Sequence, residues 1–440
     1  MTVCGAGLVI GIAVHYIIFM GTMILRHLKL CGAVLLTASL TLTGCSGSND
    51  DKAADPNEKV TLTYGVWDQN QKTAMQELAA AFTRTHPAIT VDVQLTPWEG
   101  YWTKLKAAVT GGAAPDVFWM NGPNFQLYAS NKVIAPNPEQ VDSSVYPKAL
   151  VDLYTFEGKQ YGLPKDMDTV GVWYNKKLFD AKKVAYPKDG WTWADFQNAA
   201  AGLTDAKAGV YGTAAELTSF QEYQYNTIAQ AGGYVISPDG KKSGYDDPKT
   251  IQGLKFWTDL LDKKQSPDLK TMTDTVPLQL FESGKIAMYW GGSWDVPEFT
   301  QNEYTKDKVD VAPLPKGEKQ ATIIHGVSNE VGARSKHPRQ AWEFVKYLGS
   351  KEAAEILGRT GPIPAYDGTQ QAWVSKYPGL KLQTFIDEVN YAVPFPVSKN
   401  TAAWNEAELT HLTKAWNGQQ PVSQASAELA AAMNDLLAKE

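Results

Sequence analysis

Cysteine and histidine, the residues that most often cross-link a chain or hold a metal ion, are scarce in this sequence. Its 440 residues include three cysteines and six histidines. Cys4 and Cys31 lie in or before an apolar leader, so Cys45 alone is expected in the mature chain and no internal disulfide can form. The histidines are scattered, without the spacing of a zinc site. We therefore expect no metal or other cofactor, and a core held together by burial.

The sequence also lacks an excess of basic charge and the short motifs of common enzymes. It carries 41 lysines and arginines against 47 acidic residues, a formal net charge of −6, which argues against a nucleic-acid-binding face. Gly-x-Ser-x-Gly, Ser-x-x-Lys and the phosphate-binding loop are all absent. After the leader, no apolar run is long enough to span a bilayer. We therefore expect neither an enzyme nor a nucleic-acid-binding protein.

The N-terminal segment has the order of features that directs a protein to export. Arg26 and Lys29 precede an apolar stretch that ends in Leu42-Thr43-Gly44-Cys45. This ending resembles the bacterial lipoprotein box, which implies cleavage before Cys45 and acylation of its thiol. An ordinary signal peptide that happens to end near a cysteine is the alternative.

These features divide the start of the chain into a leader and a tether. The leader is residues 1–44, with the signal peptide itself expected at 23–44. Residues 1–22 are interpreted as a mis-called start, and an additional membrane helix is the alternative. Residues 45–57 are the lipidated cysteine and a polar spacer without large apolar side chains.

Tryptophan is abundant, with 14 residues in the chain. A core does not require so many, because leucine and phenylalanine fill space without an indole N–H that needs a partner. In an exported protein the surplus suggests a ligand with flat apolar faces. Sugar rings are the usual exported ligands of this kind, so the composition favours carbohydrate.

The residues after the spacer predict an α/β lobe. Apolar residues alternate with period two over 60–66 and 89–95, and recur at helical spacing over 71–85 and 99–110. A short buried strand is expected over 116–120. Ligands of such sheets bind at the carboxyl ends of the strands, where this sequence places tryptophan beside carboxylates and amides.

Residues beyond 170 predict a second set of strands and helices. Strands are expected over 170–174 and 285–290, and helices over 193–203, 222–231 and 248–263. Thr192 is the expected N-cap of the first of these helices, with Asp195 completing a near capping box. Gly291 and the next glycine permit positive φ and close approach of a ligand. Ser293 is expected to cap the helix that follows.

Three blocks of sequence together resemble a known family. They are 114–122 (APDVFWMNG), 161–176 (YGLPKDMDTVGVWYNK) and 281–294 (FESGKIAMYWGGSW). In this order and spacing they are similar to the family 1 extracellular solute-binding proteins of bacterial ABC importers. This is the carbohydrate-type group that includes maltose-binding protein. The resemblance covers essentially the whole mature chain.

The resemblance implies a two-lobe periplasmic-binding-protein-like fold. Each lobe would be a mainly parallel sheet flanked by helices, with a hinge and an interlobe cleft. Lobe one would comprise 58–167 plus 324–362, and lobe two 168–323 plus 363–440. The chain would cross between lobes three times, near residues 166–171, 321–325 and 361–365.

The expected cleft is lined by strand ends and hinge segments. Carboxylates and amides exchange hydrogen bonds with sugar hydroxyls, and indole faces bury the C–H side of a pyranose ring. The candidate ligand-binding residues are Asp68, Gln69, Trp98, Glu99, Asn121, Asp166, Asp168, Trp290, Gly291, Trp294, His325, Gly326, Arg359 and Trp404.

Several of these residues also have a purely structural interpretation. Trp290 closes an expected strand and Trp294 opens a helix, which favours exposure of both indoles to the cleft. His325 is expected as a packed hinge histidine more than as a ligand contact. Arg359 suits a cleft role and a surface ion pair equally, and Glu216 suits the cleft wall or a helix cap.

The implied function is capture of a sugar or oligosaccharide and its delivery to an ABC importer. The expected partners are the carbohydrate ligand, transmembrane permease subunits with a separate ATPase, and the membrane through the lipid anchor. We expect a monomer held at the outer side of the cell membrane. A receptor for a non-sugar solute and an exported glycoside hydrolase with two opposed carboxylates are the alternatives.

Overall fold

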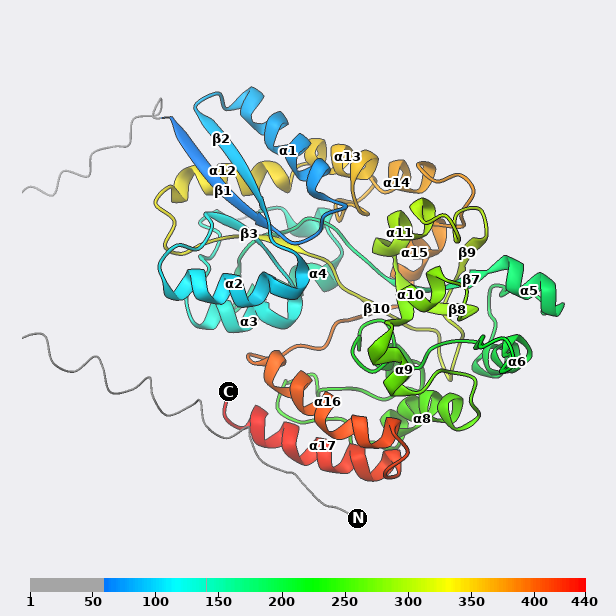
Figure 1. Ribbon diagram of the computed structural model, residues 1–440. Helices are drawn as coiled ribbons and strands as arrows, with labels where there is room; N and C mark the ends of the chain where they lie inside the picture. The colour runs from blue at the N-terminus through cyan, green and yellow to red at the C-terminus, as the bar shows by residue number, and fades with distance from the viewer. Residues whose placement is uncertain (1–58, 140) are drawn as a thin grey trace, which may run out of the picture. The chain divides into compact units, whose positions relative to one another are not determined.

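The computed structural model describes residues 59–139 and 141–440 (Figure 1). The expected leader, the expected lipidation site Cys45 and the expected spacer therefore lie outside the described residues. Within the described part of the chain, no helix combines the length and apolar character needed to cross a membrane.

The strands fall into two main sheets and two short pairs. Their bounds are β1 (Val60–Val66), β2 (Ile89–Leu95), β3 (Val117–Met120), β4 (Thr155–Phe156), β5 (Lys159–Gln160), β6 (Leu163–Pro164), β7 (Val170–Asn175), β8 (Met288–Gly292), β9 (Val309–Ala312), β10 (Thr322–Ile324), β11 (Ser328–Val331) and β12 (Ala392–Pro394).

Helices connect and cover these strands. Their bounds are α1 (Lys72–Thr85), α2 (Trp98–Thr110), α3 (Gly122–Ser130), α4 (Lys148–Leu153), α5 (Lys176–Lys182), α6 (Trp193–Leu203), α7 (Gln224–Gln230), α8 (Pro248–Asp262), α9 (Leu269–Asp274), α10 (Pro277–Glu282), α11 (Val296–Gln301), α12 (Pro338–Leu348), α13 (Lys351–Thr360), α14 (Gln371–Ser375), α15 (Gln383–Asp387), α16 (Thr401–Trp416) and α17 (Val422–Leu437). Short 3-10 turns are η1 (Ser143–Val145), η2 (Ser293–Asp295) and η3 (Glu388–Tyr391).

The first sheet has the strand order β2-β1-β3-β11-β6. β1 pairs in parallel with β2 and β3, whereas β11 runs antiparallel to both β3 and β6. Alternate residues of β3 serve two cores: Val117 and Trp119 pack with α1, α12 and α13, and Phe118 and Met120 pack with α2 and α3. Helices therefore cover both faces of this sheet, as expected for the α/β lobe that the sequence predicted.

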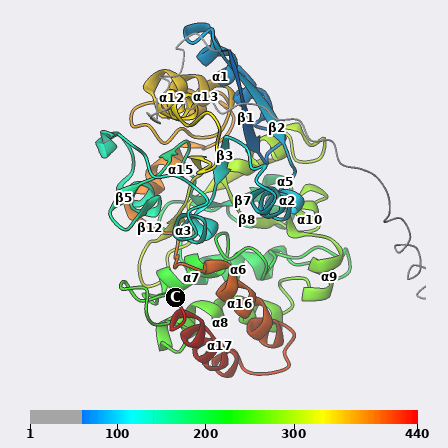
Figure 2. The ribbon, with the colours of Figure 1, turned by 90° about the vertical axis from the view of Figure 1, so that its left-hand side faces the viewer.

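The second sheet has the order β8-β7-β9 and is antiparallel throughout. The expectation of a mainly parallel sheet therefore holds for β2-β1-β3 and is wrong for this sheet. Its strands are flanked by helices, among them α6 and α8, and α8 also packs against α17. In both views α16 and α17 lie side by side at the C-terminus (Figures 1 and 2).

Three segments far apart in the sequence meet between the two sheets. The backbone of Asp168 pairs with that of His325 in an isolated antiparallel bridge, and Asp166 pairs with Pro364 in another. Lys165 N donates to Val327 O at 2.8 Å, and Met167 N donates to Ile363 O at 3.0 Å. We call these residues the hinge segments. They lie at or beside the segments near 166–171, 321–325 and 361–365 where the family resemblance implied chain crossings, and the division into two lobes stays a prediction.

The local signals of the sequence were accurate where one segment decides its own conformation. Strands over 60–66 and 89–95 and a helix over 193–203 are confirmed at those bounds. The capping box is also confirmed, because Thr192 N donates to Asp195 Oδ2 at 2.8 Å and Asp195 N donates to Thr192 Oγ1 at 3.2 Å.

Candidate functional site

The carboxyl ends of β1 and β2 bring aromatic and polar side chains to one edge of the first sheet. Val66 lies opposite Leu95 in the parallel register, so both strands end together. The residues that follow include Trp67 and Trp98, whose ring centroids are 5.5 Å apart. Trp98 is 49% exposed, and the neighbouring Glu99 is exposed as well. This edge is accessible and carries both apolar faces and carboxylates.

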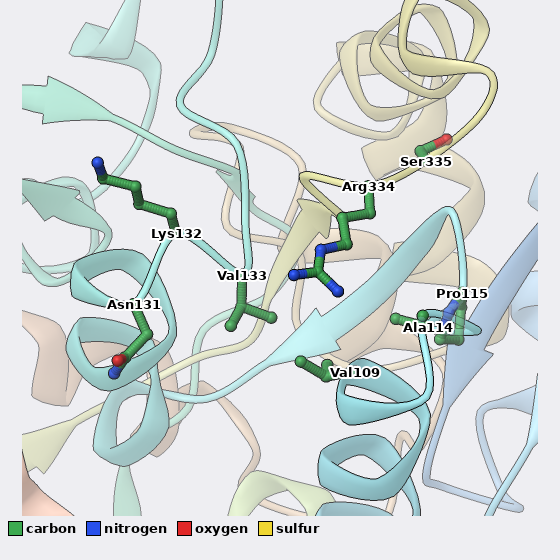
Figure 3. Close-up of a pocket in the computed structure, with 10 residues that line it drawn as sticks. Val109, Ala114, Pro115, Asn131, Lys132, Val133, Arg334 and Ser335 are labelled. Atoms are coloured by element: carbon green, nitrogen blue, oxygen red, sulfur yellow. The ribbon is translucent and has the colours of Figure 1, made fainter.

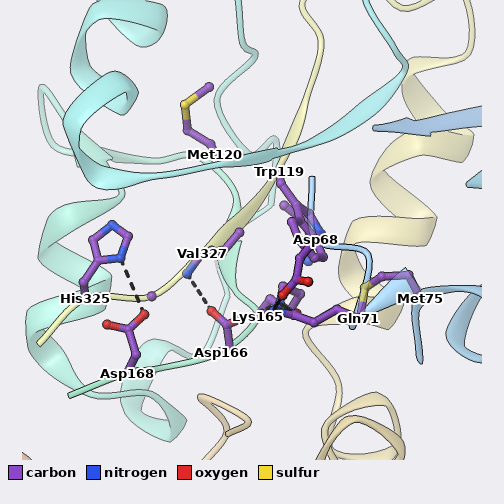
Figure 4. A network of polar contacts seen from close by, with 12 residues as sticks. Asp68, Gln71, Met75, Trp119, Met120, Lys165, Asp166, Asp168, His325 and Val327 are labelled. Carbon is purple, nitrogen blue, oxygen red and sulfur yellow. Dashed lines mark hydrogen bonds and ion pairs between the residues drawn. The ribbon is translucent and has the colours of Figure 1, made fainter. Parts of the chain in front are cut away.

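Asp68 connects this edge to the hinge segments. Its carboxylate accepts hydrogen bonds from Asn70 N and from Gln71 Nε2, each at 2.8 Å. Gln71 Oε1 in turn accepts from Lys165 Nζ at 2.9 Å, and Lys165 pairs with Asp166 (Figure 4). A polar network therefore runs from the end of β1 into the first hinge segment. Gln69, the next residue of this loop, is exposed.

Asp166 and Asp168 have different surroundings although they are two residues apart. Asp166 is buried, and its Oδ1 accepts from Val327 N at 2.6 Å, which ties two hinge segments together (Figure 4). Burial raises the pKa of Asp166, while the charge of Lys165 opposes this shift. Asp168 is only partly buried, and its Oδ1 accepts from Gln221 Nε2 at 2.6 Å. Asp166 is thus committed to the hinge, whereas Asp168 retains some access.

His325 is packed within the hinge, as the sequence favoured. Its Nε2 accepts a hydrogen bond from Gly122 N at 3.0 Å, so the ring proton is on Nδ1. That nitrogen lies 3.6 Å from Asp168 Oδ2 (Figure 4). The next residue, Gly326, has no room for a side chain because a Cβ would strike Asp166 O. Both residues therefore set the backbone geometry of the hinge.

Asn121 and Arg359 occupy helix ends. Asn121 is the N-cap of α3: its Oδ1 accepts from Asn124 N at 3.3 Å and from Asn124 Nδ2 at 2.9 Å. Arg359 is exposed in the last turn of α13, where a cation favourably meets the helix dipole. The alternative of a surface ion pair is not met among the described residues, where the one salt bridge of an arginine joins Arg339 to Glu343.

The structure contradicts the expected exposure of Trp290. The indole is fully buried among Phe196, Phe256 and Trp257, with ring centroids at 5.8, 6.0 and 4.8 Å. The reason is that β8 runs on to Gly292, so Trp290 lies inside the strand and not at its end. Trp404 is likewise fully buried, and its Nε1 donates to Ser398 Oγ at 2.9 Å. Both residues belong to the core in this structure.

The double glycine after Trp290 is needed for space and not for positive φ. Gly292 has φ of −88°, and a Cβ there would strike the ring of Trp294. A Cβ on Gly291 would meet the carboxylate of Asp295. The expectation that Ser293 caps the following helix is wrong. Ser293 begins the 3-10 turn η2, and the N-cap residue of α11 is Asp295. Trp294 remains partly exposed, so among the candidates Trp290, Trp294 and Trp404 it alone keeps access.

Buried acids surround this segment. Glu222, Asp295 and the partly buried Glu216 influence one another's ionisation. Burial raises the pKa of Glu222 to about 8 and raises the pKa of Asp295 well above its usual range. Tyr289 OH donates to Glu222 Oε1 at 3.3 Å. Burial also raises the pKa of Glu216, whose Oε1 accepts from Thr218.

Sequence reasoning missed several members of this region. Glu222 and Asp295 carried no motif, and their proximity depends on the turn before α7 and the 3-10 turn η2, which are far apart in sequence. Trp102 could have been found, because it lies four residues after Trp98 and therefore on the same face of α2. Trp67 could also have been found, because it follows β1 directly and precedes the candidate Asp68.

A separate pocket lies at the opposite edge of the first sheet. It lies beside the start of β3 and the end of β11 and is lined by Val109, Gly112, Ala114, Pro115, Asn131, Lys132, Val133, Gly332, Arg334 and Ser335 (Figure 3). The strand ends with Trp67 and Asn121 are at the other end of β1 and β3. This pocket is therefore not the expected cleft. In the described residues, no group of three or more His, Cys, Asp or Glu side chains could hold a metal ion.

Comparison with known proteins gives a consistent family. The maltooligosaccharide ABC transporter solute-binding lipoprotein of Streptococcus pneumoniae strain R6 is 26% identical over 92% of this chain and 96% of its own. The galactooligosaccharide-binding protein of Bacillus subtilis is 25% identical over 78% of this chain and 82% of its own.

A solved structure extends the likeness to the fold. An ABC substrate-binding protein from Listeria monocytogenes, in complex with cycloalternan, superimposes with a TM-score of 0.80 and 28% identity. The match covers 87% of this chain and 100% of that one. The two sheets and the hinge segments are thus those of a two-lobe α/β binding protein. The family model described as bacterial extracellular solute-binding protein matches residues 67–355, and the chain belongs to that family.

Proposed function

We propose that this protein is the extracytoplasmic receptor of an ABC importer and that its ligand is a sugar or oligosaccharide. The observation that carries the proposal is the family match together with relatives, similar over most of their length, that are named for oligosaccharides. The strand-end residues support it, because indole faces and carboxylates are the two surfaces that a sugar needs. As in the rest of the family, the protein binds its ligand and catalyses no reaction.

The proposed binding region lies between the carboxyl edge of the first sheet and the segment after β8. Asp68 and Asp168 supply carboxylates, and the partly exposed Trp294 supplies an apolar face. Asn70 Nδ2 donates to Glu298 Oε1 at 2.9 Å, so the loop after β1 lies against α11, which follows Trp294 in the chain. This contact supports placing the ligand between these two regions.

Buried acids near Trp294 favour a neutral ligand over a cationic one. A carboxyl group whose pKa is raised to about 8, as for Glu222, keeps its proton at neutral pH. A protonated carboxyl group is uncharged and donates a hydrogen bond, which suits a sugar hydroxyl. A polyamine receptor would need ionised carboxylates at this place, so a non-sugar cationic solute is disfavoured.

We also propose a division into two lobes, a lipid anchor at Cys45 and permease and ATPase subunits as partners. Lobe one is 58–167 plus 324–362, lobe two is 168–323 plus 363–440, and the hinge segments are the axis of closure. Cys45 carries the lipid that holds the monomeric receptor at the outer side of the membrane. The closed, loaded form is presented to permease subunits that work with a separate ATPase. Closure favours the loaded state through the additional contacts that lobe two makes.

A thermal-shift panel tests the proposal directly. The purified chain, in a detergent without a sugar headgroup, is heated with mono- and oligosaccharides of the malto, galacto and manno series, and with spermidine. A ligand at a hundred times its Kd stabilises the folded state by about 2.7 kcal/mol. Stabilisation by a sugar that is recovered uncleaved supports the proposal. Stabilisation by spermidine alone contradicts it, and recovery of a cleaved sugar would indicate a hydrolase.

A further inference from the structure

The amino edge of the first sheet, opposite the proposed binding region, carries a group of basic side chains. β1 and β3 start at this edge, and β11 ends there because it runs antiparallel to β3. The segments beside these strand ends contribute Lys132, Arg334 and Lys336, and Lys59 directly precedes β1. All four residues are exposed. We call these four residues the basic edge.

Negative charge is scarce around the basic edge. Asp116 is the one acid in the segments 86–88, 111–116, 131–133 and 332–337. Its carboxylate is occupied within the fold, because it accepts from Thr63 N at 2.9 Å, from Thr63 Oγ1 at 2.8 Å and from Ser335 Oγ at 2.6 Å. None of the four basic residues forms an ion pair with another described residue. The edge is therefore a positive surface on a chain whose formal net charge is −6.

Helix dipoles account for only part of this positive charge. α2 ends at Thr110 and α3 ends at Ser130, so both helices direct the negative ends of their dipoles towards the pocket lined by Lys132 and Arg334. Each dipole end corresponds to about half an elementary charge, so the two together offset about one of the four cations. After Asp116 is counted as well, about two positive charges remain in excess.

The Arg334 guanidinium faces a pocket with apolar walls. It points towards Val109 and Val133, whereas the Lys132 side chain extends away from it (Figure 3). Apolar walls limit the water that competes for the guanidinium N–H groups, and a planar guanidinium can form two parallel hydrogen bonds to a phosphate. The pocket therefore suits a single phosphate group, with further basic residues around it.

A membrane surface fits the basic edge better than a protein partner does. The described residues have exposed large apolar side chains at Trp98, Tyr186, Tyr234 and Val276, and none of these lies in the segments of the basic edge. Protein interfaces are enriched in aromatic side chains. Anionic lipid headgroups, in contrast, attract clustered lysine and arginine.

The chain enters the described fold at this same edge. The proposed lipidation site Cys45 precedes Lys59 by 14 residues, so even at full extension the lipid lies within about 50 Å of the basic edge. The carboxyl edge lies at the other end of β1, whose seven residues span about 23 Å. The basic edge is therefore the edge of the first sheet that the anchor holds nearest to the membrane.

We infer that the basic edge is a docking surface for anionic phospholipid headgroups of the membrane that holds the anchor, with one headgroup phosphate bound by Arg334. This inference rests on the proposed anchor at Cys45 and goes beyond the proposed sugar receptor. In the docked state the carboxyl edge faces away from the membrane, so the proposed binding region is open to the surrounding solution. Electrostatic attraction holds this state, and salt therefore weakens it.

Fluorescence energy transfer to a dye in the bilayer tests the docked state. The purified, acylated full chain is reconstituted in vesicles of phosphatidylcholine, with or without about one third phosphatidylglycerol. Because Cys45 is the expected single cysteine of the mature chain and carries the lipid, Ala113→Cys beside the basic edge or Ala206→Cys after α6 can carry the donor dye. Transfer from position 113 should rise with phosphatidylglycerol and fall again in high salt, and transfer from position 206 should not rise.

Charge-neutralising variants show whether the basic edge causes the docking. Lys132→Gln together with Arg334→Gln should lower the ratio of docked to undocked receptor by about 25-fold, at about fivefold for each cation near an anionic surface. Lys207→Gln together with Lys241→Gln is the matched control, because both lysines are exposed and lie between α6 and α8, away from the basic edge. Time-resolved donor decays give the docked fraction. Sugar affinity should stay unchanged in both pairs, since neither lies in the proposed binding region.

Equal transfer from position 113 in the two kinds of vesicle, or equal losses in the two pairs of variants, would overturn membrane docking and leave the sugar receptor standing. Docking that appears only in the combined variant Asp50→Asn, Asp51→Asn, Asp55→Asn and Glu58→Gln would overturn it too, because the spacer acids would then occupy the basic edge. Thermal stabilisation by inorganic phosphate without any response to phosphatidylglycerol would assign the pocket to a free anion instead. Mass spectrometry that finds no acyl chain on Cys45 would overturn the anchor and the docked state together.

Discussion

The strand ends of the two sheets carry the same residue types but bury them to different degrees. After β2, in the first turn of α2, Trp98 and Glu99 are exposed. Within and after β8, Trp290 and Asp295 are buried. The difference teaches that a tryptophan beside an acid does not by itself indicate a ligand face. The accessibility of such a tryptophan depends on whether helices distant in sequence cover it, as α6 and α8 cover Trp290.

The acids of the two regions differ in their surroundings in the same way. Glu99 at the first sheet is exposed to solvent, whereas burial raises the pKa of Glu222 to about 8. One wall of the proposed binding region therefore offers hydrogen-bond acceptors and aromatic faces. The other is backed by buried carboxyl groups that keep their protons and therefore add no negative charge. An uncharged ligand such as a sugar is compatible with both walls.

The largest expected effect comes from removing a buried tryptophan. Trp290→Ala leaves a cavity among three aromatic rings, so we expect a loss of about 3–5 kcal/mol in the free energy of unfolding. Urea denaturation measures this loss. Trp98→Ala, which removes an exposed indole, should change stability by less than about 1 kcal/mol. Equal losses in the two variants would mean that the two regions do not differ in burial.

Next in size is the dependence of stability on pH. Burial raises the pKa of Glu222, Glu388 and Glu408 to about 8. In the unfolded chain glutamate ionises near about 4.3, so between these values the folded state binds more protons. Stability is therefore highest below about pH 4.3 as far as these groups are concerned, and is lost as pH rises through about 8.

Glu408 provides the variant for this prediction. Its carboxyl group accepts from Tyr225 OH at 3.0 Å and also contacts Tyr245 and Asn405. Denaturation at pH 5 and pH 8 should show a decrease that Glu408→Gln reduces by on the order of 2 kcal/mol, because the amide does not titrate. A variant with an unchanged slope would show that Glu408 does not hold a proton in the folded state.

A third prediction concerns Trp294, which stays partly exposed after β8. Trp294→Ala should weaken every sugar that binds by about tenfold, since it removes one aromatic face from the proposed binding region. Calorimetric titration with the malto and galacto series measures these affinities. If Trp294→Ala binds all of them normally, the segment after β8 is not part of the binding region.

The smallest effect concerns the contact that links the two regions. Asn70→Ala removes the bond to Glu298 and should weaken ligand binding by about 0.5–1 kcal/mol, as expected for an exposed hydrogen bond to a charged group. Gln94→Ala is the matched control, because Gln94 Nε2 donates to Asp92 Oδ2 at 2.9 Å within β2 alone. Equal affinities in the two variants would show that the link does not favour the loaded state.

Local sequence patterns predicted much of the first sheet and little of the segment that follows β8. Period-two alternation located β1 and β2, and the buried strand expected over 116–120 is present as β3, with Trp119 fully buried. Asp116 precedes β3, and its Oδ2 accepts from Thr63 N of β1 at 2.9 Å. These features depend on neighbours within a strand or on its immediate partner, which the sequence describes directly.

The segment around β8 shows where this approach fails. The strand begins at Met288 and continues to Gly292, shifted from the predicted 285–290. That shift alone moved Trp290 from a strand end into a strand interior. Boundaries shift by a few residues because the energy of one more paired residue comes from the partner strand β7, which is remote in sequence.

By itself the sequence determined the order of elements, the capping of α6, the family resemblance in three blocks and the abundance of tryptophan. Tertiary structure decided which tryptophans remain accessible and which acids lose their charge. The physical reason is that both burial and pKa depend on atoms contributed by distant segments. Phe196 and Phe256 cover Trp290, and Glu222 and Asp295 meet across more than seventy residues of chain. Such proximity is set by packing and leaves no local pattern in the sequence.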